Sequence, residues 1–413
     1  MGRIMRILVI AMVLSLNVTA QELPADTLTL NMAIGRALEY NPEILALKKK
    51  IEASKARLLQ SGLFPNPELG LEAENIFGNN DFAGFRGSEI TATVSQEISL
   101  GSTISKRVEV SKINVELMQM DYLIKRLEII SEIRLSFIDL VALSKLIEKN
   151  SELLSLSTEF VNNLQLRVNA GKISPAEVSR SLLILNSIEL NINGLKSEYN
   201  SVLNKLATLL NLDSFGNIVI KKESDLLNII SESRLQNIEL KSNPKLKKLK
   251  LEIQKQNAVI NLEKARAIPP INLFVGVRRI NEIKTNTFLV GTSIPLPIFD
   301  RNQGIIEASQ VEMENLEKEY EALENNLKQR LRSYILNLKT LFKSAEKLKS
   351  ESLPIAEEAY KIIKQGNDVG RFTILDVLDA QRTLIEIENQ YLNIVRNANK
   401  IIVAIETITN TKI

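Results

Sequence analysis

One stretch of this sequence, Ser102–Ala170, runs for 69 residues without a glycine or a proline. Apolar residues recur along it at alternating intervals of four and three positions, at Ile113, Leu117, Met120, Ile124 and Leu127. This is the heptad-like period of helices that pack on one another as coiled coils. An unbroken helix of that length extends roughly 100 Å, far beyond the average helix of a globular domain. The chain must therefore fold around long helices that lie side by side.

Two shorter stretches, 199 positions apart, have the same order of turn-forming and helix-capping residues. In the first, read AGKISPAEV, Gly171 ends one helix and Ser174 caps the next. In the second, read VGRFTILDVLDAQ, Gly370 follows Val369 and Thr373 takes the capping position. Each stretch predicts a tight hairpin between two helices. A hairpin repeated at half the length of the chain indicates a duplicated structure.

Each half of the chain predicts the same elements: two strands, a long helix and a return helix. In the first repeat (21–211), these are strands at 67–75 and 89–98, a long helix at 102–170 and a return helix at 175–210. In the second repeat (243–413), they are strands at 270–278 and 286–296, a long helix at 305–365 and a return helix at 374–409. The predicted fold is therefore mainly α with a small β part, built from a duplicated unit.

Three further features complete this organisation. A helical pattern covers Leu28–Ser61 and bends at an Asn-Pro pair, Asn41-Pro42, which has a counterpart at Asn243-Pro244. Residues 212–242 form a small connector between the repeats, with a short strand at 218–220. Pro354 predicts a kink or restart in the second long helix.

Apolar and polar residues alternate along the four predicted strands, as in Glu89–Ile98. A strand with one apolar face and one charged face is typical of a transmembrane barrel, where it separates lipid from a lumen. A half-buried hairpin of a soluble protein has the same pattern. Four strands cannot close a barrel with a lumen, since the smallest transmembrane barrels use about eight. A membrane barrel would therefore be shared between copies, and the pattern leaves two and three subunits open.

The sequence contains no cysteine and no histidine. This excludes disulfides, thiolate and imidazole metal sites, and every catalytic arrangement that needs a histidine or cysteine. We predict no cofactor and no resident metal. The best acid–base candidates for an enzyme are Asp376 and Asp379, which fall at a helix tip without a nucleophile beside them. The sequence therefore predicts a protein that is not an enzyme.

The first 20 residues have the pattern of a secretory signal peptide. Arg3 and Arg6 precede an apolar stretch, Ile7–Leu16, and Val18-Thr19-Ala20 forms a small-residue cleavage site. The apolar stretch is about half of what a bilayer requires. Cleavage would remove two arginines and take the formal charge from +3 to +1, so no nucleic-acid partner is predicted.

These features together resemble the outer-membrane efflux protein family, the TolC-like exit ducts. The resemblance covers the mature chain, and its most specific part is Asp376–Gln381, read DVLDAQ, after Val369-Gly370. The run PNPEL at Pro65–Leu69, with Glu74-Asn75, is similar to the branch that serves cobalt–zinc–cadmium-type efflux pumps. Ser293–Asn302, read SIPLPIFDRN, also resembles the family at the junction between a strand and a helix.

The resemblance implies a homotrimer in which three chains form a 12-stranded barrel in the lipid of the outer membrane and a long α-barrel in the periplasm. It implies a passive duct whose partners are a periplasmic adaptor and an inner-membrane pump, and whose substrates are heavy-metal cations. Asp376 and Asp379 match the family's aperture aspartates. The adaptor-docking turns would include Gly171, Ser174, Val369, Gly370 and Thr373. Phe372 stands where the family pattern has an arginine, which argues against an arginine latch at the gate.

Other functions fit parts of the same pattern. Ducts for drug efflux and for type I secretion belong to the same family. A periplasmic coiled-coil structural protein is the alternative from another class, and it predicts solubility without detergent.

Overall fold

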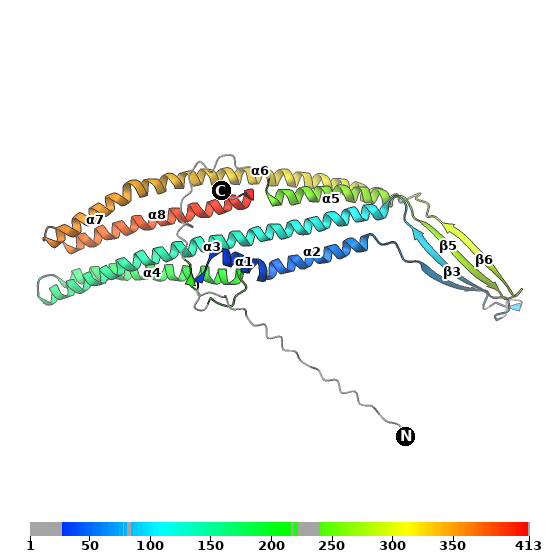
Figure 1. Ribbon diagram of the computed structural model, residues 1–413, viewed down its shortest axis with the longest axis horizontal. Helices are drawn as coiled ribbons and strands as arrows, with labels where there is room; N and C mark the ends of the chain where they lie inside the picture. The colour runs from blue at the N-terminus through cyan, green and yellow to red at the C-terminus, as the bar shows by residue number, and fades with distance from the viewer. Residues whose placement is uncertain are drawn as a thin grey trace, which may run out of the picture.

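Long helices lie side by side in the computed structural model and end in a four-stranded sheet (Figure 1). The structure describes residues 27–76, 78–80, 84–215, 219–221, 240 and 242–411. The predicted signal peptide and most of the predicted connector lie outside these residues. Within the described part of the chain, no helix combines the length and the apolar character needed to cross a bilayer.

The elements follow the predicted order in both halves. The first half contains β1 (Thr27–Leu28), α1 (Leu30–Tyr40), α2 (Pro42–Ser61), β2 (Glu68–Glu74), β3 (Glu89–Ile98), α3 (Thr103–Asn169) and α4 (Pro175–Leu209). The second contains β4 (Val219–Ile220), α5 (Pro244–Arg266), β5 (Ile271–Ile280), β6 (Thr285–Ser293), α6 (Gln303–Lys347), a π-helical segment (Leu348–Ser352), α7 (Leu353–Asp368) and α8 (Ile374–Thr409).

Two predicted boundaries are wrong for identifiable reasons. Leu28 does not begin a helix, because it pairs with Ile220 in a small parallel sheet and α1 starts only after the Thr29 cap. The strand predicted to end at residue 296 ends at Ser293. Pro295 and Pro297 follow that end, and neither has the backbone N–H that a strand ladder requires.

The second long helix is divided where the sequence predicts a break. The π-helical segment lies between α6 and α7, and Pro354 occupies the first turn of α7. The segment also explains a change in repeat spacing. Tyr122 packs with Ile44 in one core cluster, and its counterpart in the second repeat, Tyr320, packs with Leu246 in another. These two tyrosines of the long helices are 198 positions apart. A π-helical turn accommodates one extra residue, which restores the spacing of 199 found at the helical turns.

The sheet has the strand order β2-β3-β5-β6 and two chemically different faces. Its cross-strand register brings apolar residues together on one face, in the rows Leu69–Val94–Val275–Val290 and Leu71–Ala92–Val277–Phe288. This face is open, since the side chains of Phe288 and Val290 are 89% and 83% exposed. The opposite face has the charged group Arg278, which pairs with Glu89 (2.9 Å) and Glu74 (3.5 Å).

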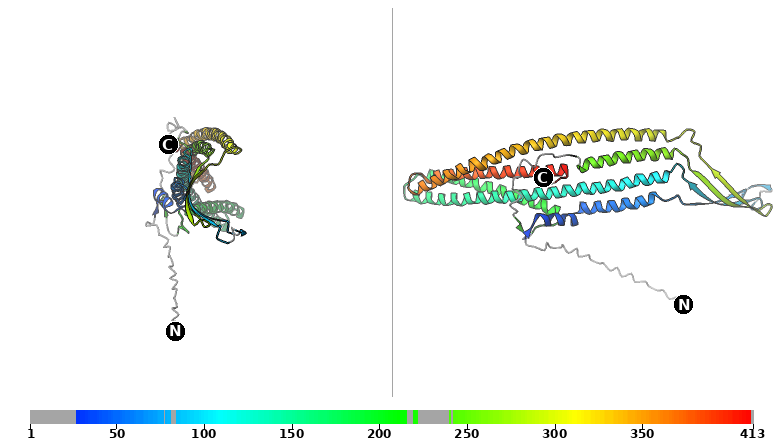
Figure 2. Two further views of the ribbon diagram at one scale, coloured as in Figure 1. Left: turned by 90° about the vertical axis from the view of Figure 1, so that its right-hand side faces the viewer. Right: turned by 45° about the horizontal axis from the view of Figure 1, so that its top comes forward.

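The helices form a curved layer in which each packs beside the next. Near the sheet the order is α2, α3, α5, α6, and at the far end it is α4, α3, α8, α7 (Figures 1 and 2). The most deeply buried side chains lie where the two arrangements overlap. They include Ile133, Phe137 and Leu140 of α3, with Leu206 of α4 and Ile405 of α8.

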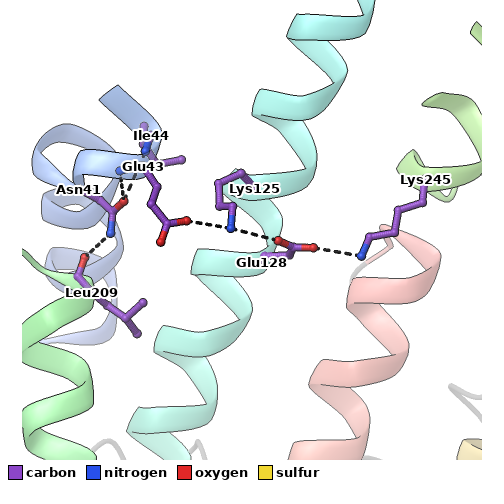
Figure 3. Close-up of polar contacts among 7 residues, drawn as sticks. All are labelled: Asn41, Glu43, Ile44, Lys125, Glu128, Leu209 and Lys245. Carbon is purple, nitrogen blue, oxygen red and sulfur yellow. Dashed lines mark hydrogen bonds and ion pairs between the residues drawn. The ribbon is translucent and has the colours of Figure 1, made fainter. Parts of the chain in front are cut away.

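The asparagine of each Asn-Pro pair joins two helices. Asn41 accepts hydrogen bonds from the N–H groups of Glu43 and Ile44 and donates one to the carbonyl of Leu209, at the end of α4 (Figure 3). Asn243 likewise accepts from Leu246 N–H and donates to the carbonyl of Ile408. Each buried amide therefore caps one helix and satisfies the last turn of another in the same repeat.

We expect Asn41→Ala and Asn243→Ala each to lower the free energy of unfolding by about 2 kcal/mol, because each removes a cap and leaves a buried carbonyl unpaired. Urea titration followed by circular dichroism measures the change. Asn204→Ala is the control, since Asn204 is exposed on α4. Equal stability of all three variants would contradict a structural role for the two amides.

Ion pairs connect the helices next to this point. Lys125 of α3 contacts Glu43 of α2 at 2.8 Å and Glu128 at 3.5 Å, and Glu128 contacts Lys245 of α5 at 3.0 Å (Figure 3). The hydrogen bond to Glu43 raises the pKa of Lys125. The chain of charges thus extends from the first repeat to the second across three neighbouring helices.

Candidate functional site

The two helical hairpins end at the same end of the molecule, opposite the sheet (Figure 1). Residues from both turns share one apolar cluster. Ile173 of the first turn and Ile374 and Leu375 of α8 pack around the buried side chains of Phe160 and Leu164. The sequence predicted two separate turns, and this cluster brings them together.

Both turns have the same backbone geometry. Gly171 and Gly370 have φ angles of +69° and +74°, a conformation that glycine adopts at little cost. In the first turn, the N–H of Gly171 donates to Val168 O (2.9 Å) and that of Lys172 to Arg167 O (2.9 Å). In the second, Gly370 donates to Asn367 O (3.0 Å) and Arg371 to Gly366 O (2.8 Å). Each pair of bonds is a Schellman motif, which ends a helix and reverses the chain.

Hydroxyl groups cap the two return helices, as their positions in the sequence predict. The Ser174 hydroxyl accepts from the N–H of Ala176 at 3.2 Å, and Thr373 accepts from the N–H of Asp376 at 3.2 Å. The Asp376 carboxylate completes the second cap by accepting from the Thr373 N–H at 2.7 Å and from its hydroxyl at 2.6 Å. This reciprocal arrangement is a capping box.

The two aspartates have different surroundings. Hydrogen bonds from the hydroxyl and N–H of Thr373 lower the pKa of Asp376, so its carboxylate is held both ionised and in a fixed position. Asp379 lies one turn further along α8 and is also exposed. The hydrogen bond and charge of Glu386, at 2.8 Å, raise the pKa of Arg382, and the charge of Asp379 adds a smaller contribution. The exposed end of α8 therefore presents two neighbouring carboxylates, one of them locked by its cap.

Phe372 stabilises the second turn, a role that the sequence did not predict. Its ring lies so close to Gly366 that a Cβ atom at that position would be 2.4 Å from Cδ2 of the ring. Asn367 also donates its side-chain amide to the carbonyl of Phe372 at 2.8 Å. Gly366, near the end of α7, is the residue in the sequence that could have predicted this contact, because only glycine leaves room for an aromatic ring against the helix backbone. Arg371 is exposed beside this contact.

The chemistry of this end of the molecule is electrostatic. Among the described residues, no group of three or more acidic, histidine or cysteine side chains is arranged to hold a metal ion. The carboxylates of one chain can attract cations, and carboxylates brought together from several chains would do so more strongly.

Residues 33–212 and 235–411 match the outer membrane efflux protein family. The cobalt-zinc-cadmium resistance protein CzcC of Cupriavidus metallidurans is 28% identical over 90% of this chain and 87% of its own length. The nickel-cobalt-cadmium resistance protein NccC of Alcaligenes xylosoxydans is 22% identical over 71% of this chain and 65% of its own. The CmeC outer membrane channel of Campylobacter jejuni has the same fold, with a TM-score of 0.75 over 92% of this chain and 85% of CmeC at 18% identity. The chain belongs to the outer membrane efflux protein family.

Proposed function

We propose that this protein is the outer-membrane duct of a tripartite efflux pump that exports heavy-metal cations. The observation that carries the proposal is the sheet, which exposes an apolar face and has a polar, charged face behind it, at one end of a layer of long helices. The apolar face suits lipid and the polar face suits a lumen. Proteins of this family are passive channels of the outer membrane and not enzymes.

The duct requires more than one chain. β2 and β6 are the edges of the four-stranded sheet, and each leaves one row of backbone groups without a partner strand in the sheet. Pairing β6 of one copy with β2 of the next would remove both edges. Three copies would supply 12 strands, enough for a barrel that encloses a lumen. We therefore propose a homotrimer, with the long helices continuing the lumen into the periplasm.

The hairpin end is the proposed aperture and docking region. In a trimer, Asp376 and Asp379 would place six carboxylates around the axis, where a charged ring controls which ions pass. The turns that contain Gly171, Ser174, Val369, Gly370 and Thr373 are the proposed contact with a periplasmic adaptor and, through it, an inner-membrane pump. Their matching Schellman motifs support this, since an adaptor would meet the same backbone shape twice per chain.

Metal cations are the proposed substrates for two reasons. Two relatives are resistance proteins for cobalt, zinc, nickel and cadmium, as their names state. In addition, the charged side chains at the exposed start of α8, before Arg382, are all acidic. Export of drugs or proteins would be an alternative within the same family.

A planar-bilayer recording of the detergent-purified protein tests the duct. We expect a small, cation-selective conductance, because carboxylates surround the narrowest point. A monomer that stays soluble without detergent and gives no conductance would contradict the proposal and favour a structural coiled-coil protein. Deleting the gene and measuring growth separates the substrates: sensitivity to cobalt, zinc or cadmium supports metal export, and sensitivity to drugs alone contradicts it.

A further inference from the structure

Two consecutive arginines at the end of β5, Arg278 and Arg279, lie on opposite faces of the sheet. On the polar face, Arg278 pairs with Glu89 and Glu74. Its Nε also donates to the hydroxyl of the buried Thr91 at 3.0 Å. The positive charge of Arg278 is therefore compensated by carboxylates of its own chain.

Arg279 has no such compensation. Its guanidinium donates to neutral oxygens, namely the carbonyl of Lys284 at 2.8 Å and the side chains of Asn286 at 3.3 Å and Asn281 at 3.4 Å. These bonds use Nε and Nη1, and Nη2 makes no hydrogen bond to the described residues. The turn thus holds the Arg279 side chain in place but leaves its charge, and two of its N–H donors, for a partner outside the described part of the chain.

The position of Arg279 on the apolar face indicates what that partner is. From the helices to the tip of the sheet, the rows of this face are Ile98–Ile271, Gln96–Leu273–Thr292, Leu69–Val94–Val275–Val290, Leu71–Ala92–Val277–Phe288 and Ala73–Ile90–Arg279–Asn286. Among these paired residues Arg279 is the one charged side chain, and it lies in the last row, at the end of the sheet that points away from the helices (Figure 1).

The length of the strand agrees with a place at the membrane boundary. The stretch from Ile271 to Arg279 extends roughly 26 Å, or about 20 Å along the axis of a barrel whose strands tilt by about 40°. The lipid-facing band of an outer-membrane barrel is about 25 Å tall. In the proposed barrel, Arg279 would therefore lie where the acyl chains end and the charged headgroups begin, within reach of a long side chain.

Further positive charges lie around Arg279. Lys284 is exposed in the turn that joins β5 to β6, and Arg86 is exposed in the loop between β2 and β3, which is hydrogen-bonded to that turn. Glu282 is the acidic residue of the turn. Apart from the compensated group around Arg278, the described residues of the tip thus carry three positive charges and one negative charge.

We propose that Arg279 and Lys284 bind a phosphate group of a lipid in the outer leaflet of the membrane. The inference rests on the membrane barrel proposed above. A guanidinium presents its N–H donors in a fork that matches phosphate oxygens, and the lysine adds a second positive charge. The apolar rows between Arg279 and the helices would contact the acyl chains of the same molecule, which favours a lipid phosphate over a free phosphate ion. Because the helices extend into the periplasm, the tip of the sheet faces the outer leaflet.

Native mass spectrometry of the detergent-purified protein tests the site. The probe is diphosphoryl lipid A, the phosphorylated anchor of lipopolysaccharide. We expect Arg279→Gln to weaken lipid A binding about tenfold and Arg279→Lys to weaken it less, because lysine keeps the charge but loses the fork. Arg180→Gln is the matched control and should bind as the wild type does, since Arg180 is exposed on α4 at the other end of the molecule. Equal binding by the wild type and Arg279→Gln would overturn the proposal.

A second variant guards against misfolding of the turn. Lys284 has a φ angle of +55°, a conformation that asparagine tolerates well, and Arg279 contacts only its backbone carbonyl. Lys284→Asn therefore keeps the turn and the position of Arg279 while it removes one charge, and it should weaken lipid A binding about fivefold. Unchanged binding would contradict the role of Lys284. An excess of inorganic phosphate should not displace lipid A, and displacement would show a free-anion site in place of a lipid site.

Planar-bilayer recording of the same preparations separates this inference from the proposed duct. If the wild type conducts ions but lipid A binds equally to the wild type and Arg279→Gln, the lipid site is wrong and the duct remains. If the wild type does not conduct but loses lipid A upon the Arg279→Gln change, the duct is wrong and the lipid site is supported.

Discussion

Arg396→Met is expected to lower the free energy of unfolding by about 3 kcal/mol, the largest stability effect that we predict for a single substitution. Arg396 of α8 is 13% exposed and contacts Asp139 of α3 and Glu198 of α4, each at 2.6 Å. Burial lowers the pKa of Arg396, but its hydrogen bonds to both carboxylates outweigh burial and raise the pKa overall. Removing the guanidinium leaves Asp139, which is 15% exposed, with Lys400 as its remaining ion-pair partner among the described residues.

Urea titration in detergent, followed by circular dichroism, measures this loss. Arg382→Met is the matched control, because Arg382 lies on the same helix and pairs with Glu386 at 2.8 Å, but both side chains are more than half exposed. An exposed pair of this kind contributes less than about 1 kcal/mol. If the two variants lose the same stability, Arg396 does not hold the three helices together.

The local elements could be predicted from sequence because their signals are local. The alternation of apolar and polar residues predicted β3 from Glu89 to Ile98. The order of glycine and Ser/Thr residues in the turn predicted the start of α8 at Ile374. The signals that failed depend on distant partners. Leu28 continues a helical pattern, but Ile220 draws it into a strand pair.

The contacts between helices could not be predicted in this way. Arg396 is 257 positions from Asp139, and nothing in the heptad pattern of either helix says which charge faces which. The hydrogen bond that Asn41 donates to Leu209 could not be predicted for the same reason, since its sequence context predicts only a bend. At the candidate site, the sequence predicted that Asp376 and Asp379 lie at a helix tip, but the capping box that fixes Asp376 needed the backbone of Thr373.

Asp376→Asn combined with Asp379→Asn is expected to raise the concentration of divalent or trivalent cation that blocks the channel about a hundredfold. In the proposed trimer this removes six negative charges from the aperture. Asparagine is chosen because its side-chain oxygen can still accept the Thr373 hydrogen bond, so the helix cap remains while the charge is lost. Single-channel recording with cation titration measures the block.

The pH dependence of the block follows from the cap. Because the pKa of Asp376 is lowered, its carboxylate stays ionised at every pH above the ordinary value of 3.8 and also somewhat below it, and the cap weakens only as the pH falls through the lowered value. Asp379→Asn alone should therefore keep a cation block that is constant from about pH 7 to about pH 5. Thr373→Ala is the control, because it removes the hydroxyl from the cap but keeps both carboxylates, and block should persist.

A double asparagine variant that conducts and is blocked like the wild type would show that cations bind elsewhere in the duct.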